Sequence, residues 1–188
     1  MNIGTLQLVA LGANLSSSSC TLEQVLEDAI ATIAKRGFVI RAISRFFRTP
    51  CFPEGAGPDY VNAAIAVQSR FDAKQALHRL HDIEAEFGRE RKQRWGQRTL
   101  DLDLIGMGGV VLPDRAGFDE WHGLDPELQA KAAPNELVLP HPRLQDRAFV
   151  LVPLADIALC WRHPVLGETI GQMLAQLPKS EVDKVTPI

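Results

Sequence analysis

Apolar positions along the first part of the chain follow two different periods, and each period predicts a different element. Residues 5–15 form an apolar run with strand-forming residues, and the run ends in residues that suit a turn. From Leu22 to Ile33 the apolar residues recur every three or four positions, which is the spacing of one helix face. Thr21 is placed to cap the start of this helix and Gly37 to cap its end. The pattern therefore predicts a strand followed by an amphipathic helix.

Residues 38–107 extend the series. Residues 38–49 and 60–71 predict two strands joined by a loop rich in proline and glycine. Residues 72–88 predict a second helix capped by its first residue, and after the basic loop 89–98 a strand is predicted at 99–107. The order strand, helix, strand, strand, helix, strand is typical of an α+β, ferredoxin-like βαββαβ core. We expect its helices on one face of a largely antiparallel sheet.

The remainder of the chain is less regular. Residues 107–136 have weak periodicity and many turn formers, so we expect a short strand at 110–112 followed by a surface excursion. Residues 137–178 predict two short helical segments that pack against the sheet as C-terminal additions. A chain of 188 residues fits one domain, so we expect a single domain at 1–188.

Composition narrows the class of protein. The apolar fraction of 46% and the charged fraction of 23% are those of an ordinary soluble globular protein. The net charge is −3, so the chain has no overall positive charge that would favour binding to nucleic acid. Three widely spaced cysteines are typical of a reducing compartment rather than of a disulfide framework. We see no signal peptide and no apolar run that is long enough to cross a membrane. We therefore expect a cytoplasmic protein. As a separate expectation, it is a monomer whose partners are small molecules, without nucleic acid or membrane.

Two carboxylates stand inside the strand predicted at 99–107. Alternate strand residues share a face, so Asp101 and Asp103 lie side by side while the leucines between and beside them face the other way. Two ionised carboxylates at this distance repel each other unless a cation lies between them, and Mg²⁺ is commonly held by one or two carboxylates plus substrate phosphates. A half-exposed strand with a polar outer face is the plainer interpretation of the same alternation.

A cluster of basic residues precedes the aspartates. Guanidinium groups beside a cation site are the parts that phosphoryl transfer requires, and this cluster is local because the rest of the chain is acidic. Trp95 lies within the cluster, where its indole is better suited to packing or stacking than to solvent. The basic residues are Arg89, Arg91, Lys92, Arg94 and Arg98.

The stretch RWGQRTLDLDLI resembles the signature of the 6-hydroxymethyl-7,8-dihydropterin pyrophosphokinases, which usually carry RWGPRTLDLD. Further segments resemble the family in the right order: LGANL at 11–15, FFRTPCF and PDYVNAA within 46–64, and LPHPRLQDRAFVLVPLADIA at 139–158. The resemblance implies transfer of a pyrophosphoryl group from ATP to the hydroxymethyl oxygen of a reduced pterin, with release of AMP, in folate biosynthesis.

The resemblance also implies roles for individual residues on the phosphate side. Asp101 and Asp103 match the ligands of two Mg²⁺ ions and, with the loop arginines Arg89 and Arg91, the catalytic set. His141 alone reads as a surface histidine in a proline turn, but the family match makes it a phosphate contact. The implied ATP-binding residues are Arg91, Arg94, Arg98, Leu104, His141 and Arg147.

On the pterin side, the resemblance implies that Tyr60 and Phe149 stack on the two faces of the ring. Without it, Phe149 reads as a core residue, because aromatics at strand spacing are usually buried. Asn62 alone could be a turn residue, but it is one strand period from Tyr60, and its amide offers both a donor and an acceptor to the pterin edge. The implied pterin-binding residues are Thr49, Pro50, Tyr60, Asn62, Trp95, Asp101 and Phe149.

Three features depart from the family pattern. Gln97 stands where proline is usual, His81 stands where many relatives have glutamine, and the segment 107–136 is longer than is common. Two other classes of function share part of the pattern. A single-stranded RNA-binding module could use Tyr60, Phe149 and the basic loop, and a two-metal nuclease could use the aspartate pair. Neither alternative accounts for the other matching segments.

Overall fold

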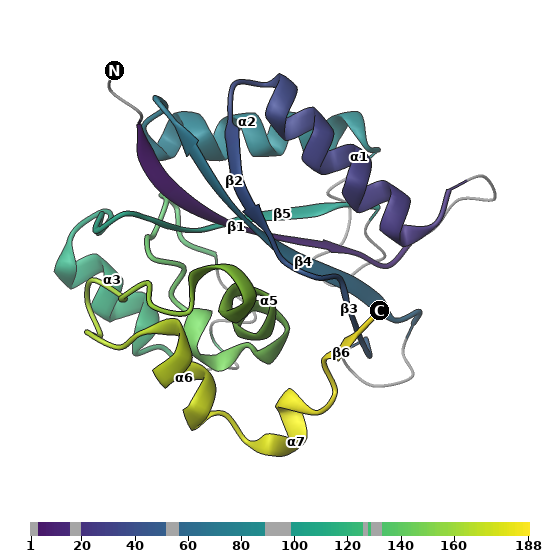
Figure 1. Cartoon of the computed structure of the whole chain (residues 1–188). Helices are drawn as coiled ribbons and strands as arrows, with labels where there is room; N and C mark the ends of the chain where they lie inside the picture. The colour runs from purple at the N-terminus through teal and green to yellow at the C-terminus, as the bar shows by residue number, and fades with distance from the viewer. Residues whose placement is uncertain (1–3, 16–19, 52–56, 89–98, 126–127, 129–132) are drawn as a thin grey trace.

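The computed structural model describes residues 4–15, 20–51, 57–88, 99–125, 128 and 133–188, and the rest of the chain is not discussed structurally. One sheet crosses the molecule (Figure 1), and every strand pairing in it is antiparallel. The strand order is β5-β1-β4-β3-β6, and β2 pairs with β4 beside β3. The strands are β1 Thr5–Ala13, β2 Val39–Ile43, β3 Phe47–Thr49, β4 Tyr60–Ser69, β5 Asp101–Met107 and β6 Thr186–Pro187.

Helices cover both faces of this sheet (Figure 1). One face carries α1 (Leu22–Lys35) and α2 (Ala73–Glu86), and the other face carries α5 (Ala148–Ala158), which packs against β4. The α+β class is confirmed, and the two helices of the core lie on one face as expected, while a helix of the C-terminal additions covers the other face. Among the described helices, none is long and apolar enough to cross a membrane. The remaining elements are α3 Arg115–His122, the short 3₁₀ helix η1 Leu144–Asp146, α6 Ile170–Gln176 and α7 Lys179–Val182.

The predicted helix starts are confirmed by their hydrogen bonds. The Thr21 hydroxyl accepts from the Gln24 backbone N–H, and the Gln24 side chain accepts from the Thr21 backbone N–H. Asp72 and Gln75 form the same reciprocal pair at the start of α2. Each pair satisfies two backbone donors that a helix start otherwise leaves without partners. Local sequence alone therefore sets where both helices begin.

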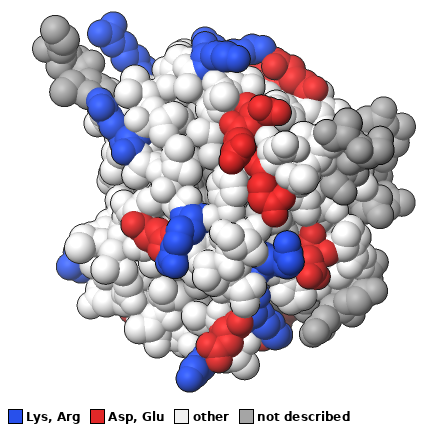
Figure 2. All heavy atoms as spheres, turned by 45° about the vertical axis from the view of Figure 1, so that its right-hand side comes forward, with Lys and Arg blue, Asp and Glu red and all other residues white. Residues whose placement is uncertain are grey.

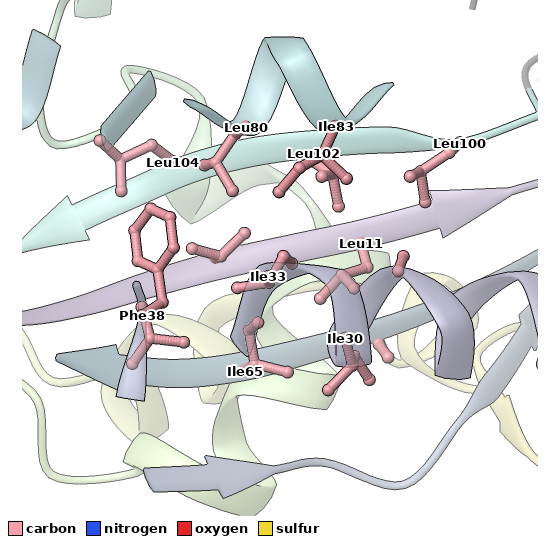
Figure 3. Close-up of a cluster of buried hydrophobic side chains, with 14 of the residues drawn as sticks. Leu11, Ile30, Ile33, Phe38, Ile65, Leu80, Ile83, Leu100, Leu102 and Leu104 are labelled. Atoms are coloured by element: carbon pink, nitrogen blue, oxygen red, sulfur yellow. The ribbon is translucent and has the colours of Figure 1, made fainter. Parts of the chain in front are cut away.

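Two apolar layers fill the space on either side of the sheet. The layer beneath α1 and α2 contains Leu100, Leu102 and Leu104, each at most 4% exposed, together with Leu80 and Ile83 of α2 (Figure 3). The layer beneath α5 and α6 is a separate cluster. It contains Leu8, Ala64, Ala66 and Ile105 from the strands, and Val150, Leu151, Leu154, Ile170 and Met173 from the helices. Because β-strand side chains alternate, the long strands β1, β4 and β5 each contribute to both layers.

The segment after β5 is more ordered than its sequence pattern predicts. Instead of a strand at 110–112, Leu112 forms a single bridge with Leu139. The expected surface excursion contains α3, whose Phe118 is fully buried with its ring centroid 5.3 Å from that of His163. Part of this segment is therefore anchored on the C-terminal part of the chain.

Candidate active site

Three residues from neighbouring strands lie in one row across the sheet. Asp101 of β5 is directly opposite Gly12 of β1, and Gly12 is directly opposite Asn62 of β4. Directly opposed residues present their side chains on the same face, so the carboxylate and the amide flank a position that has no side chain. A Cβ at Gly12 would lie 2.9 Å from Asn62 Oδ1 and 4.0 Å from Tyr60 Cδ1. Gly12 thus keeps open the space between Asp101 and Asn62.

The two aspartates point away from the α1 and α2 layer, as alternation predicts. Leu100, Leu102 and Leu104 fill that layer, whereas Ile105, which shares the face of the aspartates by alternation, packs in the α5 layer. The Asp103 side chain is 41% exposed. Because the Leu104 side chain is buried, only its backbone can meet a ligand. The carboxylate pair therefore lies on the α5 face, where Asp103 is accessible and Asp101 is half-buried.

Asn62 is held in place by a neighbouring strand. Its Nδ2 donates a hydrogen bond to Thr49 Oγ1 at 2.7 Å, and both side chains are at least 93% buried. Thr49 is opposite Tyr60 in the β3–β4 register, and Pro50 follows directly after β3. This bond leaves Asn62 Oδ1 turned towards Gly12. The buried amide has a fixed orientation before any ligand binds.

The start of α5 joins the carboxylates to an aromatic ring. Arg147, at the N-cap, places Nη1 3.9 Å from Asp103 Oδ2, and its Cζ lies 5.6 Å from the centroid of the Phe149 ring. Phe149 lies in the first turn of α5 and is 42% exposed. The interpretation of Phe149 as a strand-spaced core residue is therefore wrong. An exposed aromatic ring beside a guanidinium can stack on a planar ligand.

His141 is a neutral hydrogen-bond donor in this site. Its backbone N–H donates to the Ile105 carbonyl, and its ring Nδ1 accepts from the Arg143 backbone N–H, so the neutral ring carries its proton on Nε2. Burial, and then the positive charges of Arg147 and Arg143, lower the pKa of His141 to about 3. The ring is half-buried, so the surface interpretation of this residue is wrong.

Arg143 belongs to this cluster although the pattern did not single it out. Its Nε is buried and has no hydrogen-bond partner among the described residues, and its charge acts on His141. The only signal for it in the sequence is its position inside the LPHPRL segment. A buried guanidinium N–H of this kind is suited to an anion.

The structure brings together only some of the expected site residues. Thr49, Tyr60, Asn62, Asp101, Asp103, His141, Arg147 and Phe149 come from five separate segments and lie on, or pack towards, the α5 face. His81 lies half-buried on α2. The residues Arg89, Arg91, Arg94, Trp95, Gln97 and Arg98 lie outside the described residues.

The donor set is consistent with Mg²⁺ that is shared with a substrate. Among the described residues, no group of three or more His, Cys, Asp or Glu side chains could hold a metal ion by itself. Asp101 and Asp103 are adjacent oxygen donors, and Mg²⁺ is often bound by one or two carboxylates plus phosphate oxygens and water. These residues therefore fit an ion whose remaining ligands arrive with a polyphosphate.

Figure 2 shows basic and acidic side chains interspersed over the face it displays, and the described residues there form no continuous basic stripe.

A family model for 7,8-dihydro-6-hydroxymethylpterin-pyrophosphokinase (HPPK) matches residues 8–159, which include every segment of the site described above. The chain belongs to the HPPK family. The matched range 8–159 includes both the strand that carries the aspartates and the start of α5.

Curated relatives extend the HPPK match to nearly the whole chain. A 2-amino-4-hydroxy-6-hydroxymethyldihydropteridine pyrophosphokinase from Synechocystis is 34% identical over 96% of this chain and 80% of its own length. A protein of the same name from Methylorubrum extorquens is 32% identical over 94% of this chain and 96% of its own. The similarity is therefore not confined to the motif segments.

Solved structures share the fold. The crystal structure of a Plasmodium falciparum HPPK-DHPS triple mutant superposes with a TM-score of 0.64 at 14% identity and covers 92% of this chain. The chain spans 44% of the length of that protein. At this identity the likeness supports the HPPK fold alone.

Proposed function

We propose that this HPPK family member transfers a pyrophosphoryl group from ATP to the hydroxymethyl group of 6-hydroxymethyl-7,8-dihydropterin. The products are the pterin diphosphate and AMP, and the reaction belongs to folate biosynthesis. The observation that carries this proposal is the row Asp101, Gly12, Asn62, which sets a carboxylate and a fixed amide on either side of an open position. A site for a planar heterocycle thus adjoins a site for a polyphosphate.

The pterin binds on the Asn62 side. The Asn62 amide, oriented by Thr49, pairs with the donors and acceptors at the pyrimidinone edge of the ring. Tyr60 lies on the same face one strand period away, and the exposed Phe149 ring supplies the second stacking surface. The backbone at Pro50 and the side chains of Trp95 and Asp101 complete the proposed pterin set, as the family resemblance implies.

The triphosphate binds on the Asp103 side. Asp101 and Asp103 hold two Mg²⁺ ions, which when bound neutralise phosphate charge and bring the two substrates together. His141 donates from Nε2, and Arg147 offers its guanidinium to the phosphate oxygens. The resemblance adds Arg89, Arg91, Arg94 and Arg98, and the Leu104 backbone, to this set. Asp101, Asp103, Arg89 and Arg91 form the proposed catalytic group.

The reaction asks little covalent chemistry of the protein. The hydroxymethyl oxygen attacks the β-phosphorus of ATP, the bond from this phosphorus to the oxygen bridging to the α-phosphate breaks, and AMP leaves with that oxygen. The hydroxyl proton is lost to the surroundings. Catalysis then depends on positioning and on neutralising charge, which fixed side chains such as Asn62 and Arg147 provide.

We also propose that the core has ferredoxin-like topology. If β2 and β3 count as one interrupted strand, the strand order places the fourth strand beside the first, the first beside the third and the third beside the second. Antiparallel pairing throughout supports this assignment. We further propose a single domain at 1–188 that works as a cytoplasmic monomer on small molecules, without nucleic acid or membrane partners.

The decisive experiment is analysis of the nucleotide product. The protein is incubated with ATP, Mg²⁺ and the reduced pterin, with each omitted in turn, and nucleotides and pterins are separated by chromatography. We expect AMP and pterin diphosphate in equal amounts, and only in the complete mixture. ADP as the product, or nucleotide turnover without pterin, would reject the proposal.

A further inference from the structure

A buried carboxylate on α2 reaches the strand that carries the aspartates. Glu84 is 1% exposed, and its Oε1 accepts a hydrogen bond from the Leu102 backbone N–H at 2.7 Å. Leu102 stands between Asp101 and Asp103 in β5. Glu84 lies on α2, which packs against β5, and its side chain meets the backbone of that strand rather than the site itself.

The position of β5 in the sheet explains why such a contact is needed. Among the described strands, β5 lies at the end of the strand order and pairs with β1 alone, so half of its backbone donors point away from the sheet. Leu102 is one of these residues and its side chain is buried, so its N–H needs a partner other than water. A carboxylate is the strongest acceptor that a side chain can offer to a backbone N–H.

We propose that Glu84 is a positioning residue for the two metal-binding aspartates. By accepting from the N–H of Leu102, the Glu84 carboxylate fixes the position and twist of the β5 backbone at the residue between the two aspartates. The directions of the Asp101 and Asp103 side chains follow from that backbone, because alternate strand residues share one face. This inference rests on the proposed function, since it requires that the aspartates bind Mg²⁺.

The hydrogen bond, rather than the negative charge, is the property that positions the strand. A glutamine at residue 84 retains an oxygen acceptor on a side chain of the same length, whereas a methionine fills similar space without a strong acceptor. If Glu84 only fills space in the core, both variants should behave like the unaltered protein. If its negative charge acts on the metal site, both variants should lose Mg²⁺ affinity. Glu84→Gln and Glu84→Met therefore separate the three roles.

Two measurements are made on each variant. The Mg²⁺ concentration for half-maximal AMP release is determined at saturating ATP and pterin. Binding of Mg²⁺ with α,β-methylene-ATP, whose α–β linkage cannot be cleaved in the proposed reaction, is measured by calorimetry. Outer partners of metal ligands typically affect metal affinity by about 10- to 100-fold. We therefore expect Glu84→Met to raise the half-maximal Mg²⁺ concentration, and to lower the affinity for Mg²⁺ with the analogue, by about tenfold or more. Glu84→Gln should stay close to the unaltered protein in both.

The Leu102 amide provides a readout that does not depend on metal. Its hydrogen exchange should be slow in the unaltered protein and in Glu84→Gln, and markedly faster in Glu84→Met. Leu80→Ala is the matched control. Leu80 is fully buried on the same helix, but its apolar side chain offers no acceptor to the backbone of β5. It should lower the melting temperature and leave the Mg²⁺ requirement unchanged.

The contrary outcomes are distinct. An unchanged Mg²⁺ requirement in Glu84→Met, or an equal rise in Leu80→Ala, would overturn the positioning role while the enzyme stays active. Loss of Mg²⁺ affinity in Glu84→Gln would assign the effect to charge and overturn it too. If Glu84→Met does not fold, Glu84→Ala takes its place with the same expected result. If the unaltered chain releases no AMP and binds no Mg²⁺ with the analogue, the proposed function fails and the positioning role fails with it.

Discussion

The guanidinium of Arg147 lies between the Asp103 carboxylate, 3.9 Å away, and the face of the Phe149 ring, 5.6 Å away. One side chain therefore connects the carboxylate pair with the exposed aromatic ring at the start of α5. At 3.9 Å the ion pair is loose, and the Asp103 side chain is 41% exposed, so this contact contributes little to stability. Its importance lies in holding a positive charge ready at the place where phosphate is proposed to bind.

Arg147→Ala should therefore weaken ATP binding more than it weakens the fold. A hydrogen bond to a charged group contributes about 1.5–3 kcal/mol, so we expect KM for ATP to rise by about 10- to 100-fold. Steady-state kinetics with varied ATP measure the effect. Arg115→Ala is the matched control, because Arg115 also pairs with a carboxylate, Asp119, but on α3. An equal loss in both variants would refute a specific role for Arg147.

Asp101→Asn and Asp103→Asn test the carboxylate pair without changing its shape. An amide is a much weaker Mg²⁺ ligand than a carboxylate, so each change should lower kcat by about a thousandfold or more. Circular dichroism should show an intact fold, since neither side chain fills an apolar layer. Asp114→Asn, at the N-cap of α3, should leave kcat unchanged. Near-normal turnover in either strand variant would contradict the metal-binding assignment.

Gly12→Ala tests the open position between Asp101 and Asn62. The added Cβ would lie 2.9 Å from Asn62 Oδ1, so the amide must move from the orientation that Thr49 gives it. Misplacement of a substrate by about 1 Å can cost about a hundredfold, and we expect a loss of this size in kcat/KM for the pterin. Binding of ATP should change much less. Gly109→Ala, with nothing within 4 Å of the added atom, should be silent, and an equal effect there would refute the interpretation.

His141 should stay neutral throughout the physiological pH range. Its pKa is lowered to about 3, first by burial and then by the charges of Arg147 and Arg143. Nitrogen-15 NMR of the imidazole should show the tautomer protonated on Nε2 from pH 8 down to pH 5, with no protonation step. The pH dependence of turnover should accordingly contain no step from this residue. A midpoint between pH 5 and 8 for His141 would contradict the arrangement described here.

His163 should make the fold sensitive to acid. Burial and the nearby His122 lower the pKa of His163 to about 4, whereas the ordinary value in an unfolded chain is about 6.5. Between these values the unfolded chain binds a proton that the folded chain does not, so the free energy of unfolding falls as the pH drops below about 6.5. His141 adds to the same trend.

His163→Asn should therefore reduce the loss of stability between pH 7 and pH 5. Asparagine retains an acceptor for the backbone N–H groups of Val165 and Leu166, which now donate to His163 Nδ1, but it does not titrate. Urea unfolding at the two pH values measures the difference. Phe118→Leu, which alters the ring that packs on His163, should lower stability by similar amounts at both. An unchanged pH dependence in His163→Asn would refute the assignment.

Local patterns predicted the elements that local forces determine. The alternation from Leu100 to Leu104 gave the correct face for both aspartates because strand periodicity needs only one buried side. Thr21 and Asp72 are predictable as caps because a cap bonds to the backbone three residues away. In each case the deciding interaction lies within a few residues of the pattern that predicts it.

Interactions between distant segments were not predictable in this way. The α5 segment is apolar on most sides because it lies between the sheet and α6. Its helical period is therefore obscured, and the pattern around Phe149 resembles the spacing of a strand. Glu84 reads as an ordinary polar helix position, since its burial depends on a donor 18 residues further along the chain. Arg143 became recognisable only when the structure brought it to His141.

The pairing of β6 with β3 has a consequence for how the protein is made. Arg48 pairs with Thr186, 138 positions later in the chain, and Ile188 donates to the Phe46 carbonyl. While the chain grows on a ribosome, β3 can acquire this neighbour only after residues 186–188 have emerged. The edge of β3 that faces β6 therefore stays open long after the residues of the layer beneath α1 and α2 are available, so β3 gains its two neighbours, β4 and β6, at widely separated stages of synthesis.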